Sequence, residues 1–180
     1  MKARTRNLSL AVGIAVAAGL TAATGTPAQA AGSYDYLVFE KNSGDQTHSK
    51  LTLYRHEQNG RTVTLDSWRA GSGTTTNSCT RNAGWLPNGT YQIPWRDEDY
   101  DGSKIKGYVV RLSDKKCANG TQRDDLFIHS EMTRTGGQGS AEPWRWDGDS
   151  DYKSNGCVKL RPADIKDLFR YPKPVKLIVK

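Results

Sequence analysis

A cysteine and a histidine beside two apolar segments are the residues of this chain best suited to covalent chemistry. Cys157 lies within Ser154-Asn155-Gly156-Cys157-Val158, and His129 closes the apolar run that begins at Leu126. A thiol needs a base or a positive field to react as a thiolate at neutral pH, and histidine is the usual partner. Glycine before the cysteine lets the backbone approach a substrate, so N–H groups near Gly156 and Cys157 can face a developing oxyanion.

Both residues also have a purely structural interpretation. Cys157 can be a buried core thiol, and His129 can be a strand-end histidine whose hydrogen bonds are satisfied. His48 and His56 lie in polar, turn-rich sequence, and we do not expect either to act as a base. A cysteine and a histidine occur together by chance in many chains, so the surrounding sequence must decide.

The three cysteines divide into a pair and a single residue. Cys79 and Cys117 both lie in polar, loop-like sequence, and an oxidising compartment favours their pairing as a disulfide. The odd number leaves Cys157 as the free thiol.

The sequence has no CxxC motif and no Cys/His ligand cluster, so we predict no metal site.

Two acidic segments imitate parts of a calcium loop. In Asp97 to Gly102 the twelfth position is Tyr108 instead of a bidentate glutamate, and in Asp147 to Tyr152 the sixth position is not glycine. We interpret both segments as solvated acidic turns.

Residues 1–30 have the features of an export signal. Lys2, Arg4 and Arg6 precede the apolar run Leu8 to Leu20, and Ala28-Gln29-Ala30 offers a small-x-small cleavage site. The apolar run is short for a membrane span, and a retained anchor is the alternative. We predict a signal peptide at 1–30, one domain at 31–180, a secreted protein and no membrane partner after signal removal.

The distribution of charge along the chain disfavours nucleic acid as a partner. The chain has 180 residues, with 26 Lys and Arg against 19 Asp and Glu, for a net charge of +7. The charges are interspersed, whereas nucleic-acid binders usually concentrate a basic face. We therefore predict no nucleic-acid partner.

The remaining sequence indicates a β-rich domain with one short helix. Leu51, Leu53, Val63 and Leu65 alternate with polar residues around Asn59-Gly60, which predicts a hairpin with a tight turn and positive φ at both central residues. The other predicted strands are Tyr36 to Glu40, Thr90 to Pro94, Tyr108 to Leu112, Leu126 to His129 and Val175 to Val179.

Two segments flank the cysteine. Pro162 to Phe169 has apolar residues at helical spacing and a proline suited to the first turn, so we predict a helix there. Thr133 to Lys153 is rich in Gly, Trp and Asp and has no period. Long irregular loops inside a domain are usually functional or disordered.

Together these segments resemble the L,D-transpeptidase catalytic domain, the YkuD-like family. Ile128-His129-Ser130 matches the family's histidine segment, and Ser154 to Val158 matches its Ser/Thr-His-Gly-Cys segment. Leu86 to Ile93 is similar to the family's Pro-x-Gly-x-Tyr turn and strand. The resemblance covers nearly all of 31–180. It implies a mainly β fold, an L,D-transpeptidase-like mixed β-sheet sandwich with one short helix after the nucleophile.

The sequence departs from the family pattern at two points. Asn155 stands where the family most often has a second histidine, which leaves rate and substrate preference open. The separation of His129 and Cys157 is longer than usual, and the extra length falls in the loop 133–153. An insertion there need not disturb the site if its ends stay close.

The resemblance implies an exported peptidyltransferase that acts on peptidoglycan stem peptides in the cell wall. Cys157 would attack the carbonyl after the third residue of a stem tetrapeptide, D-alanine would leave, and an amine of a second stem would resolve the thioester into a cross-link. His129 would move the proton, and Ser130 would orient the imidazole through its backbone carbonyl. No cofactor is needed, and a carbapenem would acylate the thiol.

Further residues are candidates for the site. Asn155, Gly156 and Ser154 would line it. Lys159 or Arg161 would bind a stem carboxylate, with a solvated helix start as the alternative. Trp144, Trp146 and Tyr152 would form an aromatic lid, or else would hold the loop against the body of the domain.

Two other functions remain open at this point. With water as the acceptor, the same site would make an L,D-carboxypeptidase. A domain that kept the fold without the chemistry would be a wall-binding or inhibitory module. The sequence does not identify the acceptor, the stem composition or the oligomeric state.

Overall fold

The computed structural model describes residues 32–180, and the signal peptide predicted at 1–30 lies outside them. The described part of the chain is mainly β. Its elements are β1 Tyr34–Glu40, β2 Ser49–His56, β3 Thr62–Ser72, β4 Gly89–Gln92, β5 Arg96–Asp101, β6 Lys106–Arg111, β7 Lys115–Lys116, β8 Gln122–Arg123, β9 Phe127–His129, the 3-10 helix η1 Asp149–Tyr152, β10 Val158–Lys159, α1 Pro162–Leu168 and β11 Lys176–Val179.

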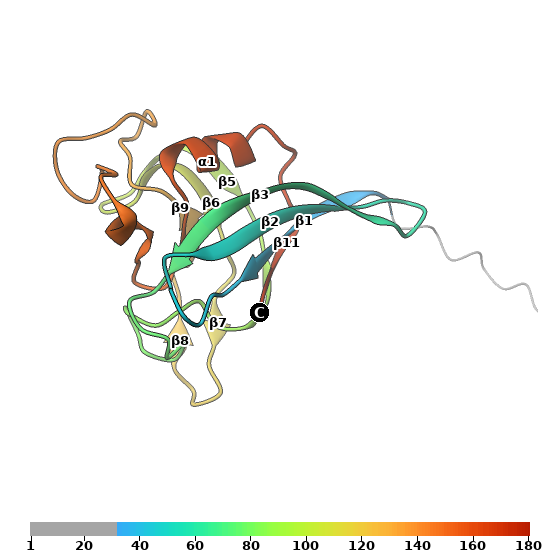
Figure 1. Cartoon of the computed structure of the whole chain (residues 1–180), viewed down its shortest axis with the longest axis horizontal. Helices are drawn as coiled ribbons and strands as arrows, with labels where there is room; N and C mark the ends of the chain where they lie inside the picture. Colours follow the sequence, from blue (N-terminus) through green and yellow to red (C-terminus); the bar gives the residue numbers. More distant parts are fainter. Residues whose placement is uncertain (1–31) are drawn as a thin grey trace, which may run out of the picture. The chain divides into compact units, whose positions relative to one another are not determined.

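Nine of these strands form one mixed sheet. Its order is β4-β11-β1-β2-β3-β10-β9-β6-β5, and β7 pairs with β8 separately. The pairs β1/β11 and β10/β9 are parallel, and the other neighbours are antiparallel. The long strand β3 joins the half of the sheet that contains β4, β11, β1 and β2 to the half that contains β10, β9, β6 and β5. It pairs with β2 along most of its length and with β10 at its end (Figure 1).

The strands β4-β11-β1-β2-β3 and the strands β10-β9-β6-β5 enclose the larger of two apolar clusters. Leu37 of β1 and Leu53 of β2 are fully buried in the same cluster as Val110 of β6, Ile128 of β9 and Val158 of β10. Since alternate residues of a strand face opposite sides, one face of each strand points into this core. The predicted mixed-sheet sandwich with a short helix is thereby confirmed.

The predicted hairpin forms, but its turn is wider than the sequence suggested. Gly60 has a φ of 82°, whereas Asn59 is not among the described non-glycine residues with positive φ. The Glu57 N–H donates to the Arg61 carbonyl, and the Asn59 side chain accepts from the Arg61 N–H. Asn59 therefore supports the turn with its side-chain oxygen, and only the glycine needs the left-handed conformation.

The interpretation of Asp97 to Gly102 as a solvated turn is wrong. Most of this segment belongs to β5, which pairs antiparallel with β6 at the edge of the sheet. An edge strand leaves one side free for charged side chains. Lys106 pairs with Asp101, and Arg134 pairs with Asp99, so part of the acidic charge is compensated.

The helix α1 follows β10 as predicted, with Pro162 at its first turn. The loop that begins at Thr133 leaves β9 and returns at the adjacent strand β10, so its ends are close although it is long. Within this loop η1 packs against β3, where Tyr152 lies against Gly71.

The cysteines divide as the sequence suggested. A disulfide joins Cys79, in the loop after β3, to Cys117, beside β7, with a Cα–Cα distance of 5.7 Å. Cys157 is a buried free thiol.

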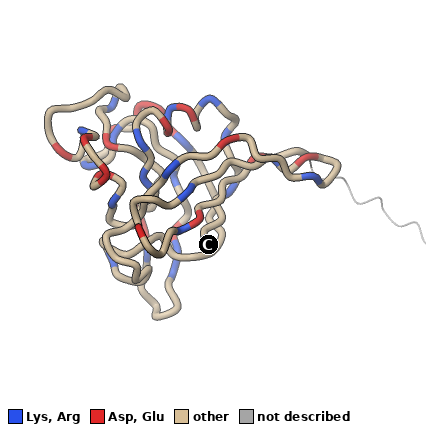
Figure 2. The backbone as a smooth tube through the Cα atoms, viewed as in Figure 1, with Lys and Arg blue, Asp and Glu red and all other residues tan. Residues whose placement is uncertain are grey.

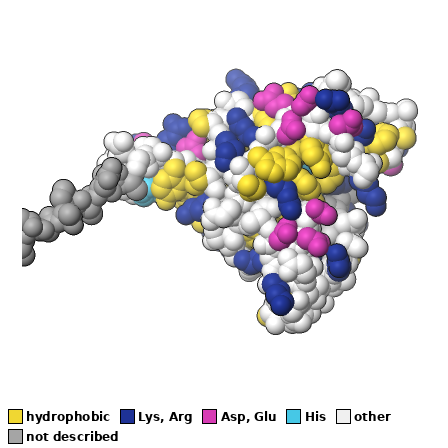
Figure 3. Space-filling model, turned by 180° about the vertical axis from the view of Figure 1, so that it is seen from behind, with side chains coloured by type: hydrophobic (Ala, Val, Ile, Leu, Met, Phe, Trp, Pro, Cys, Tyr) yellow, Lys and Arg dark blue, Asp and Glu magenta, His cyan; other side chains and the backbone are white. Residues whose placement is uncertain are grey.

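The surface of the described residues carries both signs of charge. Figure 3 shows hydrophobic side chains gathered on one face, with basic and acidic side chains around them. No helix within residues 32–180 is long and apolar enough to cross a membrane.

Replacing Gly71 by alanine should destabilise the fold. The added methyl would lie 2.6 Å from the Tyr152 Cβ, and the neighbouring atoms include Tyr152 backbone that cannot move alone. We expect a loss of about 1–3 kcal/mol in the free energy of unfolding, measured by urea denaturation. Gly44→Ala is the control, because its nearest neighbour, the Asn42 side chain, would be 3.5 Å away. Equal stability of the two variants would contradict this packing.

Candidate active site

The pairing of β9 with β10 brings Cys157 and His129 to the same face of the sheet. Lys159 lies opposite His129, and Val158 lies opposite Ile128. Because side chains alternate along a strand, Val158 and Ile128 enter the core, while Lys159 and His129 point to the other side. Cys157 precedes Val158 and therefore shares the side of Lys159.

This side opens into a cavity of about 620 Å³. Both the thiol of Cys157 and the imidazole of His129 line it, together with Ser154, Asn155 and Lys159. The structure thus gathers five of the residues singled out in the sequence around one cavity.

The thiol of Cys157 is buried against apolar side chains. It packs with Val109 and Phe127, and its Sγ donates to the Asp125 carbonyl at 3.6 Å. Burial raises the pKa of Cys157 to about 11, although the Phe127 N–H and the cations Lys159, Arg111 and Arg123 favour the thiolate. At neutral pH the resting residue is therefore the protonated thiol.

The imidazole of His129 is neutral as well. Burial, with the nearby Lys159 charge, lowers the pKa of His129 to about 3. Its Nδ1 lies 3.0 Å from the Ser130 carbonyl oxygen. Since a carbonyl can only accept, Nδ1 carries the proton and Nε2 keeps a free lone pair. This arrangement leaves Nε2 able to accept a proton from a thiol.

The turn before Cys157 is fixed by one buried hydroxyl. Ser154 Oγ donates to the Cys157 carbonyl at 2.6 Å and accepts from the N–H groups of Gly156 and Gly73, each at 3.0 Å. The Gly156 N–H is thus occupied and is not a free oxyanion donor. The N–H of Cys157 itself is the remaining candidate from the pair named in the sequence.

A buried arginine that the sequence analysis did not single out supports the same turn. Arg123 of β8 is 2% exposed. Its Nη2 donates to the carbonyls of Gly84 at 2.9 Å and Asn155 at 3.4 Å, and its Nη1 donates to Ser78 and Trp85.

The same guanidinium packs against Gly156. Gly156 has a φ of 126°, and a side chain there would collide with Arg123. The glycine before the nucleophile is therefore required both by its backbone conformation and by the close approach of the arginine. Only its long-range contacts reveal Arg123, because a lone arginine between Gln122 and Asp124 has no distinguishing pattern.

Lys159 lines the cavity but its charge is already engaged. It forms a buried ion pair with Glu131 Oε1, which also lines the cavity. The Oε2 atom of Glu131 is buried without a hydrogen-bond partner. A stem carboxylate would have to compete with Glu131 for Lys159.

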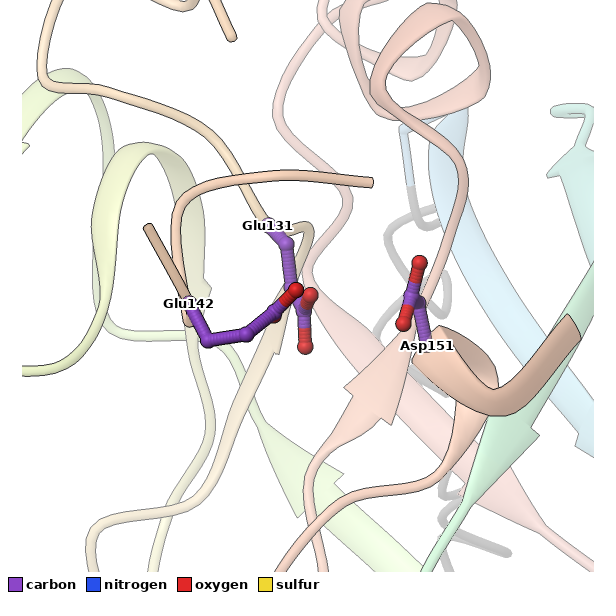
Figure 4. Close-up of side chains that lie close together, drawn as sticks. All are labelled: Glu131, Glu142 and Asp151. Carbon is purple, nitrogen blue, oxygen red and sulfur yellow. The ribbon is translucent and has the colours of Figure 1, made fainter. Parts of the chain in front are cut away.

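Two further carboxylates approach Glu131 from the loop. Figure 4 shows the carboxyl groups of Glu131 and Glu142 close to one another, with Asp151 of η1 across from them. Ligand atoms of the three lie within 4.8 Å of one another, so among residues 32–180 this is the group that could hold a cation. Burial raises the pKa of Glu131 to about 7, and the Lys159 ammonium already supplies one compensating positive charge.

The other predicted substrate-binding residues lie outside the cavity lining. Arg161 makes a two-pronged contact with Asp164 at 2.9 and 3.0 Å at the start of α1, which is the alternative interpretation given above. Trp146 packs edge-on against Tyr152, with 4.8 Å between the ring centres, and Lys106 lies over the ring of Trp144. The aromatic residues thus pack along the loop, whereas Pro143 and Lys153 are the loop residues that line the cavity.

The cavity rim has residues that sequence reasoning missed. Tyr100 of β5 and the exposed Lys104 and Lys153 line it. Lys104 and Lys153 form no ion pair within the described residues, so they are free to meet a carboxylate. Tyr100 and Lys104 belong to the β5–β6 hairpin and Lys153 to the loop after η1, so no local spacing in the sequence indicates that they meet.

Comparison with known proteins identifies the family. The family described as YkuD, L,D-transpeptidase catalytic domain, matches residues 44–179. The chain belongs to this family. Its members are cysteine enzymes that modify peptidoglycan, and the segments quoted for the resemblance fall inside the matched range. No curated protein matches the chain significantly.

A solved structure has the same fold. The crystal structure of the helical cell shape determining protein Pgp2 from Campylobacter jejuni superposes with a TM-score of 0.51 at 13% sequence identity. The match covers 83% of this chain and 48% of Pgp2, so this L,D-transpeptidase-family chain spans about half of that protein.

The pH dependence of alkylation should reveal the protonated thiol. With a pKa of about 11 for Cys157 in the fold, the thiolate fraction rises roughly tenfold per pH unit between pH 7 and 10. We expect the rate of iodoacetamide labelling, followed by intact mass, to rise in the same way. In urea without reductant, where the protein is unfolded, the labelling rate should level off above the ordinary pKa of a thiol. A native profile already flat at pH 7 would show a preformed thiolate instead.

Proposed function

We propose that this protein is an exported L,D-transpeptidase that cross-links peptidoglycan stem peptides through a thioester on Cys157. The observation that carries the proposal is the neutral thiol and the neutral imidazole of His129 on one face of the sheet, lining one cavity, in a chain of the YkuD family. We place its site of action in the cell wall, in keeping with the signal-like residues 1–30.

The two protonation states favour general-base catalysis over a standing ion pair. As Sγ attacks the carbonyl carbon after the third stem residue, His129 Nε2 takes the thiol proton. The oxyanion forms beside the Cys157 N–H. The carbon–nitrogen bond then breaks, His129 gives its proton to the departing D-alanine amine, and the thioester remains.

The second half of the reaction reverses these roles. An amine of another stem attacks the thioester, His129 accepts its proton, and the sulfur leaves to recover the thiol. In our proposal Ser130 holds the imidazole tautomer through its carbonyl, and Ser154 fixes the turn that carries the nucleophile. Lys104 and Lys153 are our candidates for the stem carboxylates, in place of Arg161.

Two other functions compete with this proposal. With water as the acceptor the same site is an L,D-carboxypeptidase, because nothing in the cavity lining distinguishes amine from water. A non-catalytic wall-binding or inhibitory module is the alternative in another class. Asn155 in place of the family histidine is the feature that favours it.

A carbapenem should acylate the wild-type protein once, on Cys157, because an activated thiol opens the β-lactam ring. Intact mass spectrometry measures the adduct, and Cys157→Ala should show none. His129→Gln should slow acylation by about 10²–10⁴-fold, the usual contribution of a positioned base. A folded wild type that stays unmodified would support the binding module.

Product analysis with a tetrapeptide stem as substrate separates the two enzymatic alternatives. A cross-linked dimer supports transpeptidation, and a tripeptide as the only product supports the hydrolase.

Arg123 is in our proposal a positioning residue that acts through the turn 154–156. Arg123→Lys keeps a charge but loses the fork of donors, so acylation should slow by about ten- to hundredfold with an unchanged alkylation pH profile. Arg123→Gln should also move that profile to higher pH, because the Arg123 charge lowers the pKa of Cys157.

The matched control for Arg123 is Arg96→Gln. Arg96 is a partly buried arginine that also donates to a backbone carbonyl, that of Tyr171 at 2.8 Å, and it does not line the cavity. This variant should have the acylation rate and the alkylation pH profile of the wild type. An Arg123→Gln protein with a normal rate and pH profile would show that the arginine is only structural.

A further inference from the structure

A second cavity lies on the other side of the loop that follows β3. It measures about 520 Å³ and shares no lining residue with the cavity of Cys157. Lys41, Lys115, Lys116 and Lys180 line it, and no aspartate or glutamate does. Figure 2 marks the basic positions of this region, including β7.

Lys41 is a half-buried cation without a counter-ion. Its Nζ donates to the Leu86 carbonyl at 3.1 Å and lies 5.2 Å from the centre of the Trp85 ring. Burial lowers the pKa of Lys41, which means that the surroundings do not compensate its charge. No carboxylate of residues 32–180 pairs with it.

Lys115 and Lys116 add two more uncompensated charges. Lys115 Nζ lies 5.0 Å from the centre of the Tyr91 ring and packs against Gly89, which fixes the ammonium in place. Lys116 is exposed. Neither residue forms an ion pair within the described part of the chain.

The two acidic residues beside these lysines in the chain, Glu40 and Asp114, do not offset this charge, because Asp114 pairs with Arg111. Glu40 pairs with Lys50 and with Lys180, each at 3.1 Å, so two ammonium groups already share one carboxylate. The remaining three lysines stay uncompensated. A cavity lined by one sign of charge concentrates the opposite sign from solution.

The walls of this cavity are held in place. The Cys79–Cys117 disulfide joins the loop after β3 to the residue that follows β7, and both cysteines line the cavity. Trp85 and Pro87 form another wall. A rigid frame lets several ammonium groups act on one ligand without a large loss of side-chain entropy.

We infer that this cavity is a binding site for a phosphate-bearing anion, either a free polyphosphate or a phosphodiester chain. A phosphate group offers several oxygens around more than one negative charge, and lysines bind it as point charges from several directions. The open side admits a chain longer than one unit. The site goes beyond the proposed function and needs no reaction at Cys157.

Calorimetric titration of the full chain with sodium tripolyphosphate tests the site. We expect saturable binding to one site that weakens with added salt. Lys115→Gln/Lys116→Gln should weaken it by about tenfold or more, because two charge-assisted contacts are lost. Lys41→Gln should do the same, and a circular dichroism melt checks that it remains folded.

The matched control is Lys166→Gln/Lys176→Gln. Like Lys115, these two lysines lie over aromatic rings, and neither forms an ion pair within residues 32–180, so the control removes the same charge from elsewhere. It should bind like the wild type. Equal weakening in both double variants would overturn the proposal in favour of net charge alone, as would the absence of saturable binding.

Two further ligands identify the chemistry and its source. Citrate binding as tightly as tripolyphosphate would overturn the assignment to phosphate. A polyglycerol phosphate that binds more tightly than tripolyphosphate would identify the chain as the ligand, and the reverse order would identify the free anion. Carbapenem acylation of Cys157 should be unchanged in all the lysine variants.

Discussion

The site depends on the parallel pairing of two very short strands. β9 and β10 set His129 opposite Lys159 and so bring the imidazole and the Cys157 sulfur to one face, while Ile128 and Val158 anchor the other face in the core. Parallel neighbours need a long connection. The loop 133–153 provides it, and its residues Pro143 and Lys153 also line the cavity.

Burial around this pair decides how the chemistry begins. Desolvation disfavours both the thiolate and the imidazolium, so the resting site holds two neutral partners. In the mechanism that we propose, charge develops only as the thiol proton moves. The cations Lys159, Arg111 and Arg123 are already in place around the sulfur, and the buried ion pair of Lys159 with Glu131 keeps one of them fixed. Such preorganised charges do not have to rearrange during the reaction.

Local patterns predicted most of the core-facing strands. The alternation in β2 and β3, the final strand β11 and the helix that starts at Pro162 all follow from short-range periodicity and turn residues. β5 was missed because its residues are almost all charged, and only pairing with β6 at the edge of the sheet makes it a strand. The aromatic residues Trp146 and Tyr152 pack against each other along the loop instead of lining the cavity.

Most of the core-facing strands, the candidate catalytic pair Cys157 and His129, and the glycine between Asn155 and Cys157 could be found from the sequence alone. Tertiary structure decided which groups surround them. Arg123 reaches Gly84 and Asn155, and Glu131 captures Lys159, through contacts between residues far apart in the chain. Periodicity reports only which side of a strand a residue faces. The partners on that side, and hence the charge and the burial of the site, are set when the sheet closes around its core.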